Sequence, residues 1–485
     1  MRIPALAAFA LTLVASAFPS AIRAETRLPH VFGSHMVLQR DLELTVWGWD
    51  DAGTEVRVRL GDSSVSGKAG DDGKWSVKLP KQSAGGPVAM TVTGSSKVEL
   101  SDILIGEVWV CSGQSNMEWS VSRTTNGKEE IAAAKHPTIR LFHVPKVPAG
   151  LPQDDVDAQW KVCSPETIPS FSAVGYFFGR HLSSELDVPI GLINTSWGGT
   201  RIEPWTPPEG FAQVEAVREM GESILRRRKE VAAAEAAAKQ AGQPAPKTPL
   251  ADRGVPMGLY NGMVHGLAPF GIKGAIWYQG EANRLDGALY TLKMHALIKG
   301  WRTVWGQGDF PFYYVQLAPF IYRGAEPTML PVLWEAQTAV LKLKNTGMAV
   351  TTDIATVNNI HPPNKQDVGK RLALWALAKS YGKNELTYSG PQYRSMKIDG
   401  TGIWLEFDHS DGLKSRDKKP LDWFTIAGDD SEFVPAKAVI HENKVHVSSE
   451  KIAKPTHVRF GWDQTAEPNL VNGADLPASP FRTGQ

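Results

Sequence analysis

The sequence predicts an α/β protein in which a parallel β-sheet, covered by helices on both faces, is flanked by two β-rich modules. Between residues 103 and 385, short apolar runs alternate with helical segments, which is typical of a parallel sheet covered by helices. Before and after this region, at 25–102 and 386–485, short alternating strands are separated by turn residues instead. With 485 residues, the chain is long enough for several domains.

The first 24 residues have the pattern of a signal peptide. Arg2 precedes an apolar run from Ile3 to about Phe18, and small residues that suit cleavage after Ala17 or Ala24 follow. The run is too short and too rich in alanine for a membrane span. We therefore expect a secreted or periplasmic protein.

Composition argues against several classes of partner and cofactor. A net charge of +1 gives no attraction to nucleic acid or to a membrane, and no protein partner is evident. The chain has two cysteines and no CxxC, HExxH or histidine-rich cluster, so we expect no metal and no cofactor. Cys111 lies at the end of a predicted core strand and is expected to be a buried free thiol rather than paired with Cys163.

The flanking modules and the central domain differ in pattern. Alternating runs at 43–49 and 55–60 with turns at 71–73 and 85–87 predict a small antiparallel sandwich, and 439–447 predicts a hairpin in the C-terminal module. In the central domain the apolar runs at 108–112, 190–194, 274–278, 312–317 and 348–352 predict strands, and 172–186 and 365–380 predict helices. A helical excursion at about 211–256 interrupts this rhythm; we expect a solvated helix over 215–240, with a mobile lid as the alternative.

Four polar segments follow or precede these elements, where an α/β enzyme holds its catalytic groups. Ser115 lies on a small-residue turn after the 108–112 strand, where a nucleophile would stand. Gly199, in a pair of glycines after the next strand, allows a backbone N–H to approach a ligand. Gln279 follows another strand and offers an amide to a developing oxyanion, while His361, just before a helix, is a candidate base. Taken alone, each segment is also consistent with an ordinary structural turn.

Together the segments Gly-Gln-Ser-Asn-Met, Trp-Gly-Gly-Thr, Tyr-Gln-Gly-Glu-Ala-Asn and Ile-His-Pro-x-Asn-Lys-Gln resemble the sialate O-acetylesterase-like carbohydrate esterases of the SGNH hydrolase superfamily. The resemblance runs from about Leu28 to the Pro480-Phe481-Arg482 ending. It implies a flavodoxin-like hydrolase domain and metal-independent removal of acetyl groups from sugars. It also implies Ser115 as nucleophile, His361 as base, and an oxyanion hole built from the Ser115 and Gly199 amides and the Gln279 side chain. Supporting positions in the same segments are Gln114, Asn116, Glu281 and Asn283.

The sequence departs from the family pattern at the acid of the catalytic triad. The family usually carries Asp two residues before the histidine, and this chain has Asn359 there. An amide can hold an imidazole but cannot stabilise imidazolium by charge. Three interpretations stay open: a Ser-His dyad helped by Asn359, a triad completed from elsewhere by Asp353, Glu281 or Glu335, or a weakened enzyme.

We therefore expect a secreted serine esterase that deacetylates carbohydrate through an acetyl-enzyme intermediate, acting on O-acetylated sialic acid or on acetylated plant polysaccharide. The first alternative is a non-catalytic carbohydrate-binding protein on the same fold. The second is a glycoside hydrolase that uses two carboxylates, such as Glu281 and Glu335.

Overall fold

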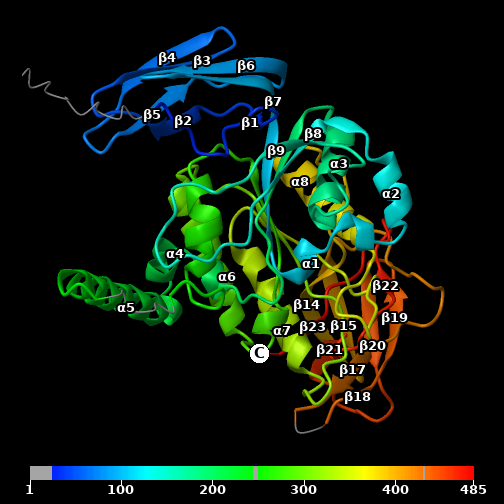
Figure 1. The fold of residues 1–485 in the computed structure, drawn as a ribbon. Helices are drawn as coiled ribbons and strands as arrows, with labels where there is room; N and C mark the ends of the chain where they lie inside the picture. The colour runs from blue at the N-terminus through cyan, green and yellow to red at the C-terminus, as the bar shows by residue number, and fades with distance from the viewer. Residues whose placement is uncertain (1–24, 244–249, 430–431, 485) are drawn as a thin grey trace, which may run out of the picture.

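The structure, a computed structural model, describes residues 25–243, 250–429 and 432–484. It contains a central α/β unit, an N-terminal β module on one side and a C-terminal β module on the other (Figure 1). The segment assigned to a signal peptide lies outside the described residues. None of the described helices is long and apolar enough to cross a membrane.

The central sheet has the strand order β13-β12-β11-β7-β10-β8-β9. All neighbours in it are parallel except β8 and β9. The chain leaves β7 toward β8 and β10 on one side and returns past it to β11, β12 and β13 on the other, so the order reverses at β7. Its strands are β7 (Lys97–Gly113), β8 (His136–His143), β9 (Trp160–Cys163), β10 (Ile190–Asn194), β11 (Gly274–Tyr278), β12 (Phe312–Val315) and β13 (Thr346–Ala349).

Helices cover both faces of this sheet, as the sequence predicts. On one face, Trp109 of β7 packs edge-on against Phe178 of α3 at 5.0 Å between ring centroids. On the other, Trp301 of α6 lies edge-on to Phe312 of β12 at 6.0 Å. Because alternate residues of a strand point to opposite faces, large aromatic residues on each face give each helix layer its own anchors. The helices are α1 (Ser115–Glu118), α2 (Gly127–Ala133), α3 (Ala173–Leu186), α4 (Pro208–Gln213), α6 (Leu289–Trp305), α7 (Met329–Ala339) and α8 (Lys365–Ser380).

The N-terminal module is continuous with the central sheet through β7. The first half of β7 pairs with β6 and the second half with β10 and β11. The domain boundary that the sequence predicts between residues 102 and 103 thus falls inside one strand, and no linker separates the two units. The other strands of the module are β1 (Val37–Gln39), β2 (Leu44–Trp49), β3 (Glu55–Leu60), β4 (Ser63–Lys68), β5 (Lys74–Leu79) and β6 (Gly85–Thr93).

The C-terminal module has a hydrophobic core of its own, built around residues such as Ile403, Val447 and Phe460. Arg482 joins it to α7 by two hydrogen bonds to the Glu335 carboxylate, at 3.0 and 2.9 Å. The hairpin expected at 439–447 is present as β19 and β20. The strands are β14 (Gln392–Asp399), β15 (Gly402–Asp408), β16 (Lys414–Ser415), β17 (Phe424–Ala427), β18 (Val434–Pro435), β19 (Lys437–His441), β20 (Lys444–Ser448), β21 (His457–Phe460), β22 (Leu470–Val471) and β23 (Phe481–Arg482).

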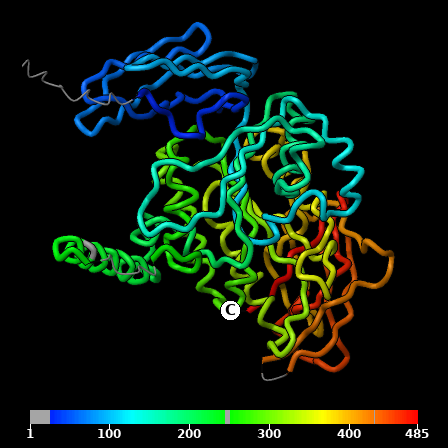
Figure 2. The backbone as a smooth tube through the Cα atoms, in the orientation of Figure 1, coloured from blue at the N-terminus to red at the C-terminus, as the bar shows by residue number. Residues whose placement is uncertain are grey.

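The helical excursion forms α5 (Glu215–Gln240), which projects from the body of the protein (Figure 2). Its first turns are anchored, where Val217 packs with Phe211 and Met257 in a small separate core. The remainder carries ion pairs typical of a solvated helix, such as Arg226 with Glu219. The solvated helix predicted over 215–240 is therefore present.

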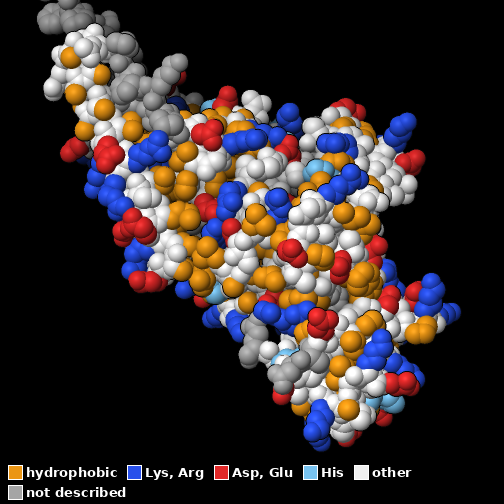
Figure 3. Space-filling view, turned by 90° about the horizontal axis from the view of Figure 1, so that it is seen from below, with side chains coloured by type: hydrophobic (Ala, Val, Ile, Leu, Met, Phe, Trp, Pro, Cys, Tyr) orange, Lys and Arg blue, Asp and Glu red, His pale blue; other side chains and the backbone are white. Residues whose placement is uncertain are grey.

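Two further expectations concern cysteine and charge. Cys111 and Cys163 are both buried and unpaired, and burial raises the pKa of the Cys163 thiol to about 12. Positive and negative side chains are interspersed over the face seen from below (Figure 3), in keeping with a net charge of +1.

Candidate active site

Ser115 stands at the carboxyl end of β7, where the strand order reverses. Gly113, the last residue of β7, has φ +137°, and a Cβ atom there would lie 2.2 Å from the Tyr278 carbonyl oxygen. Only glycine fits this close approach of β7 to β11. Gln114 then donates its N–H to the same carbonyl at 2.9 Å, and α1 begins at Ser115. The turn thus places Ser115 at the crevice where open α/β sheets bind ligands.

Ser115 and His361 line the same pocket, which has a volume of about 400 Å³. The His361 ring stacks on the indole of Trp119, with 4.7 Å between centroids and 20° between planes. Arg123 covers the same indole, with its guanidinium carbon 3.8 Å from the ring centroid. The other residues around the pocket are Glu118, Ser120, Ser122, His143, Lys146, Pro169 and Ser170.

Asn116 connects the nucleophile segment to the histidine segment. Its Nδ2 donates to the Ile360 carbonyl at 2.9 Å and to Glu281 Oε1 at 2.6 Å. Lys365 Nζ donates to Asn116 Oδ1 at 2.6 Å. Because Asn116 follows Ser115 and Ile360 precedes His361, this buried network fixes the two segments against each other.

Gln114 and Gln279 connect the remaining segments. Gln114 Oε1 accepts the N–H of Ala282 at 3.2 Å. Gln279 Nε2 donates to the Thr200 carbonyl at 3.1 Å and to Asn283 Oδ1 at 2.7 Å. Since an amide nitrogen has two hydrogens, both are engaged in this structure. Gln279 therefore contacts the loop that carries Gly199, and its role as a direct oxyanion donor stays a prediction.

The glycine pair of the second segment lies directly against the nucleophile. A Cβ atom on Gly198 would lie 3.2 Å from Ser115 Cβ, and the Gly198 N–H donates to the Glu118 carboxylate. Gly199 has φ +72°, with open space around its Cβ position. The Ser115 N–H, in the first turn of α1, has no acceptor within that helix. Of the two residues whose amides the family resemblance assigns to the oxyanion hole, Ser115 lines the pocket, and Gly199 follows the glycine that contacts Ser115; the role of both amides stays a prediction.

The residues considered as third member of a triad, Asn359 among them, form hydrogen bonds with groups other than the His361 ring. Asn359 Oδ1 accepts the backbone N–H of His361 at 2.9 Å, so it holds the main chain and not the ring. Asp353 forms two 2.6 Å bonds with Arg371, and Glu335 is paired with Arg482. Glu281 is buried, with Oε1 on Asn116 and no hydrogen-bond partner for Oε2 among the described residues. None of these four side chains lines the pocket that Ser115 and His361 share.

Glu118 is the carboxylate in this pocket, and the sequence interpretation missed it. Lys146 and the Gly198 N–H bind its two oxygens. Its negative charge raises the pKa of His361. The available signal was spacing, because Glu118 follows Ser115 by three residues and therefore lies on the same side of the α1 turn.

The electrostatic environment keeps His361 ready to accept a proton. Burial, and then the positive charges of Lys365 and Arg123, lower the pKa of His361 below its ordinary value, with Glu118 acting in the opposite direction. Burial also lowers the pKa of Lys365 well below its usual range and raises that of Glu281. A neutral imidazole beside a serine is what general-base catalysis requires. Across 25–243, 250–429 and 432–484, no cluster of three or more His, Cys, Asp or Glu side chains is arranged to hold a metal ion.

Comparison with known proteins agrees with this geometry. Residues 105–238 and 253–378 match the family described as carbohydrate esterase, sialic acid-specific acetylesterase. Sialate O-acetylesterase of Rattus norvegicus is 30% identical over 483 residues, covering 90% of this chain and 89% of the relative; that of Homo sapiens is 32% identical over 415 residues, covering 75% and 73%. A crystal structure of a carbohydrate acetylesterase from Xanthomonas citri superposes with a TM-score of 0.84 at 36% identity, covering 95% of this chain and 100% of the other.

Proposed function

Because this chain belongs to the sialic acid-specific acetylesterase family of carbohydrate esterases and is a carbohydrate O-acetylesterase, we propose that it works as a secreted serine esterase through an acetyl-enzyme intermediate. The observation that carries the mechanism is the shared pocket of Ser115 and His361, held by the bond from Asn116 to the carbonyl beside His361. Secretion rests on the pattern of the first 24 residues alone.

In the proposed reaction the Ser115 hydroxyl attacks the acetyl carbonyl while His361 takes its proton. The negative charge on the carbonyl oxygen is stabilised by the N–H groups of Ser115 and Gly199, with Gln279 holding the Gly199 loop or donating directly. His361 returns the proton to the sugar oxygen as that alcohol leaves. Water then attacks the acetyl-serine with His361 again as base, which releases acetate and restores the serine.

Glu118 supplies the negative charge that Asn359 cannot. Its carboxylate faces the pocket and favours the imidazolium that forms during the attack. It acts across the pocket rather than through a hydrogen bond to the ring. We therefore propose a Ser115–His361 dyad, electrostatically assisted by Glu118, with Asn359 holding the His361 main chain.

Two substrate classes are candidates for this chain. The mammalian proteins are named sialate O-acetylesterases, and the Xanthomonas citri protein is a carbohydrate acetylesterase. The mammalian names support O-acetylated sialic acid, and we propose acetylated plant polysaccharide, with a role in polysaccharide degradation, as the second candidate.

The experiment is acetate release by the protein and by Ser115→Ala from acetylated sialic acid, acetylated xylan, acetylated xyloglucan oligosaccharide and an aryl acetate. We expect release from at least one sugar, and a loss of several orders of magnitude in the variant. A modest loss would show that another residue is the nucleophile. Release of reducing ends instead of acetate would favour the glycoside hydrolase, and a folded protein silent on every substrate would favour the carbohydrate-binding alternative.

A further inference from the structure

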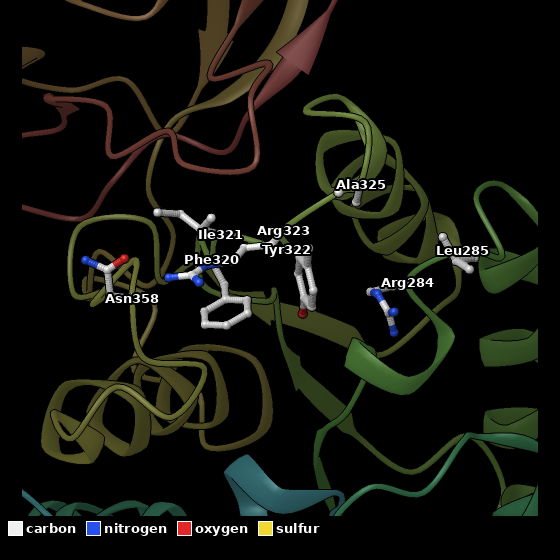
Figure 4. A pocket seen from close by; sticks show the side chains of 9 residues that line it. Arg284, Leu285, Phe320, Ile321, Tyr322, Arg323, Ala325 and Asn358 are labelled. Atoms are coloured by element: carbon white, nitrogen blue, oxygen red, sulfur yellow. The ribbon is translucent and has the colours of Figure 1, made fainter.

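A second hollow, of about 920 Å³, lies at the same edge of the central sheet (Figure 4). Three loops build it, each following the carboxyl end of a strand: Arg284 and Leu285 after β11, residues 320–325 after β12, and Asn358 after β13. The backbone N–H of Ile321 donates to the Val357 carbonyl at 2.9 Å, which ties the second and third loops together.

This hollow lies at the same carboxyl edge of the central sheet as the reaction site and shares no lining residue with it. Asn358 lies three residues before His361 on one loop, and Arg284 directly follows Asn283 of the third catalytic segment. The Ser115 pocket is built by the segments that follow β7 and β9 and by the end of β8 with the loop after it, together with His361. Because parallel strands end at a common edge, the hollow extends the catalytic edge toward β12 and β13.

Its aromatic residues offer the surfaces that sugars bind. Tyr322 stands between Arg284 and Phe320 (Figure 4), with its ring centroid 5.1 Å from the Arg284 guanidinium carbon and 4.8 Å from the Phe320 centroid. Both rings are half-buried, so each keeps apolar surface at the hollow. Flat apolar rings beside hydrogen-bonding groups are the usual composition of a small-molecule site.

The charge of the lining is positive. Arg284 and Arg323 both line the hollow, and no Asp or Glu of the described residues does. Arg284 Nη1 donates to the Glu281 carbonyl at 3.3 Å, a neutral acceptor, and Arg323 is exposed. Guanidinium groups match carboxylates in geometry and charge, so a negatively charged ligand is favoured here over a neutral one.

We propose that this hollow is a second carbohydrate subsite that binds a sugar unit bearing a carboxylate, on a substrate whose acetyl group lies at Ser115. The proposal rests on the carbohydrate esterase function above and adds a preference for acidic glycans. The carboxylate would pair with Arg284 and Arg323, and the sugar ring would pack on Phe320 and Tyr322. A carboxylated sugar can be a sialic acid or a uronic acid, and the two are separated by the probes below.

The test is calorimetric binding of probes that carry no acetyl ester, so no turnover occurs. Sialyllactose is compared with lactose, and xylotriose bearing glucuronic acid with xylotriose. We expect one acidic probe to bind about tenfold tighter than its neutral partner, the size of one charge-assisted hydrogen bond. Which acidic probe shows the preference identifies the sugar.

Substitutions of the two arginines test whether the hollow is responsible for the tighter binding of the acidic probe. Arg323→Ala and Arg284→Ala should abolish the tenfold difference, Arg323→Lys should retain part of it, and Arg227→Ala on α5 should leave it intact as a control of equal charge change. Circular dichroism checks that each variant is folded. Equal binding of acidic and neutral probes by the unmodified protein, or an equal loss in Arg227→Ala, would overturn the subsite. Acetate release from an aryl acetate is measured separately, so that result leaves the esterase proposal standing.

Discussion

At the residue scale, the protonation of His361 determines how the site responds to pH. Burial and two nearby cations hold the pKa of His361 below its ordinary 6.5. The neutral base is then present above that lowered pKa and is lost as pH falls through it. We expect the acidic limb of kcat/KM for an aryl acetate to lie below pH 6.5.

The pH dependence of kcat/KM also tests the proposed electrostatic role of Glu118. Removing its charge in Glu118→Gln should move the acidic limb to still lower pH and reduce kcat, because the imidazolium loses a negative charge that favours it. Glu450→Gln, an exposed change in the C-terminal module, is the control and should leave the limb in place. A limb that stays fixed or moves to higher pH in Glu118→Gln would contradict the proposed role.

Asn359→Asp tests whether the departure from the family pattern limits the rate. A carboxylate at this position can still accept the His361 backbone N–H, and it adds a negative charge near the imidazole. We expect acetate release to rise and the acidic limb to move to higher pH. A fall in activity would indicate that another acid already serves the histidine fully.

Gln279→Ala separates an oxyanion or positioning role from substrate contact. Because Gln279 holds the Thr200 carbonyl next to Gly199, the change should lower kcat about 100-fold with little change in KM, the size of one lost oxyanion donor. Steady-state kinetics on an aryl acetate measure both constants. A rise in KM at constant kcat would place Gln279 in substrate binding instead.

Sequence reasoning at this scale predicted Ser115 and His361 as nucleophile and base, because each stands in a motif next to a strand or helix end, and the structure places both at one pocket. This reasoning did not find Glu118 at the pocket, nor the pairing of Asp353 and Glu335 with arginine side chains. Those depend on which side chains meet across the sheet edge, and residues far apart in sequence decide that. Arg371 and Arg482, which hold these two acids, belong to α8 and β23.

At the scale of elements, β7 shows where patterning succeeds and where it fails. The continuous apolar run at 108–112 predicted a buried strand, and the same strand extends back to Lys97. Its first part alternates between exposed and half-buried residues and its second part is wholly buried, so one strand carries two patterns. The helices predicted over 172–186 and 365–380 match α3 and α8 almost to the residue, and in the structure Ser172 and Asn364 cap their N-termini.

The turn between β7 and α1 is tested by Gly113→Ala. A Cβ atom there would overlap the Tyr278 carbonyl, so the free energy of unfolding should fall by about 3 kcal/mol and activity should fall with it. Gly306→Ala is the matched control, since Gly306 also has a left-handed φ, +65°, but open space around its Cβ position. Its cost should be about 1 kcal/mol. Urea unfolding compares the two, and equal losses would contradict the steric account of Gly113.

At the scale of the whole molecule, the N-terminal module and the central domain share one hydrophobic core. Val58 and Met90 of the module belong to the same cluster as Val110 and Leu192 of the central sheet. The two regions could be predicted from the sequence, because short alternating strands give way there to apolar runs that alternate with helical segments. Their fusion through β7 could not be predicted, because it depends on pairing partners on both sides of that strand.

This shared core predicts joint unfolding. Amide hydrogen exchange in increasing urea should show β6 and β10 opening with the same free energy, since both depend on pairing with β7. Opening of β6 at a clearly lower free energy, with β10 still protected, would show that the module is an independent unit.

The central claim, that Ser115 is the nucleophile of a serine esterase, is tested most directly by labelling with an aryl phosphonate followed by peptide mass spectrometry. We expect one adduct, on the peptide that contains Ser115, forming in step with the loss of acetate release. We also expect no adduct in Ser115→Ala and slow labelling in His361→Ala. An adduct on another serine, or full activity after Ser115 is modified, would contradict the claim.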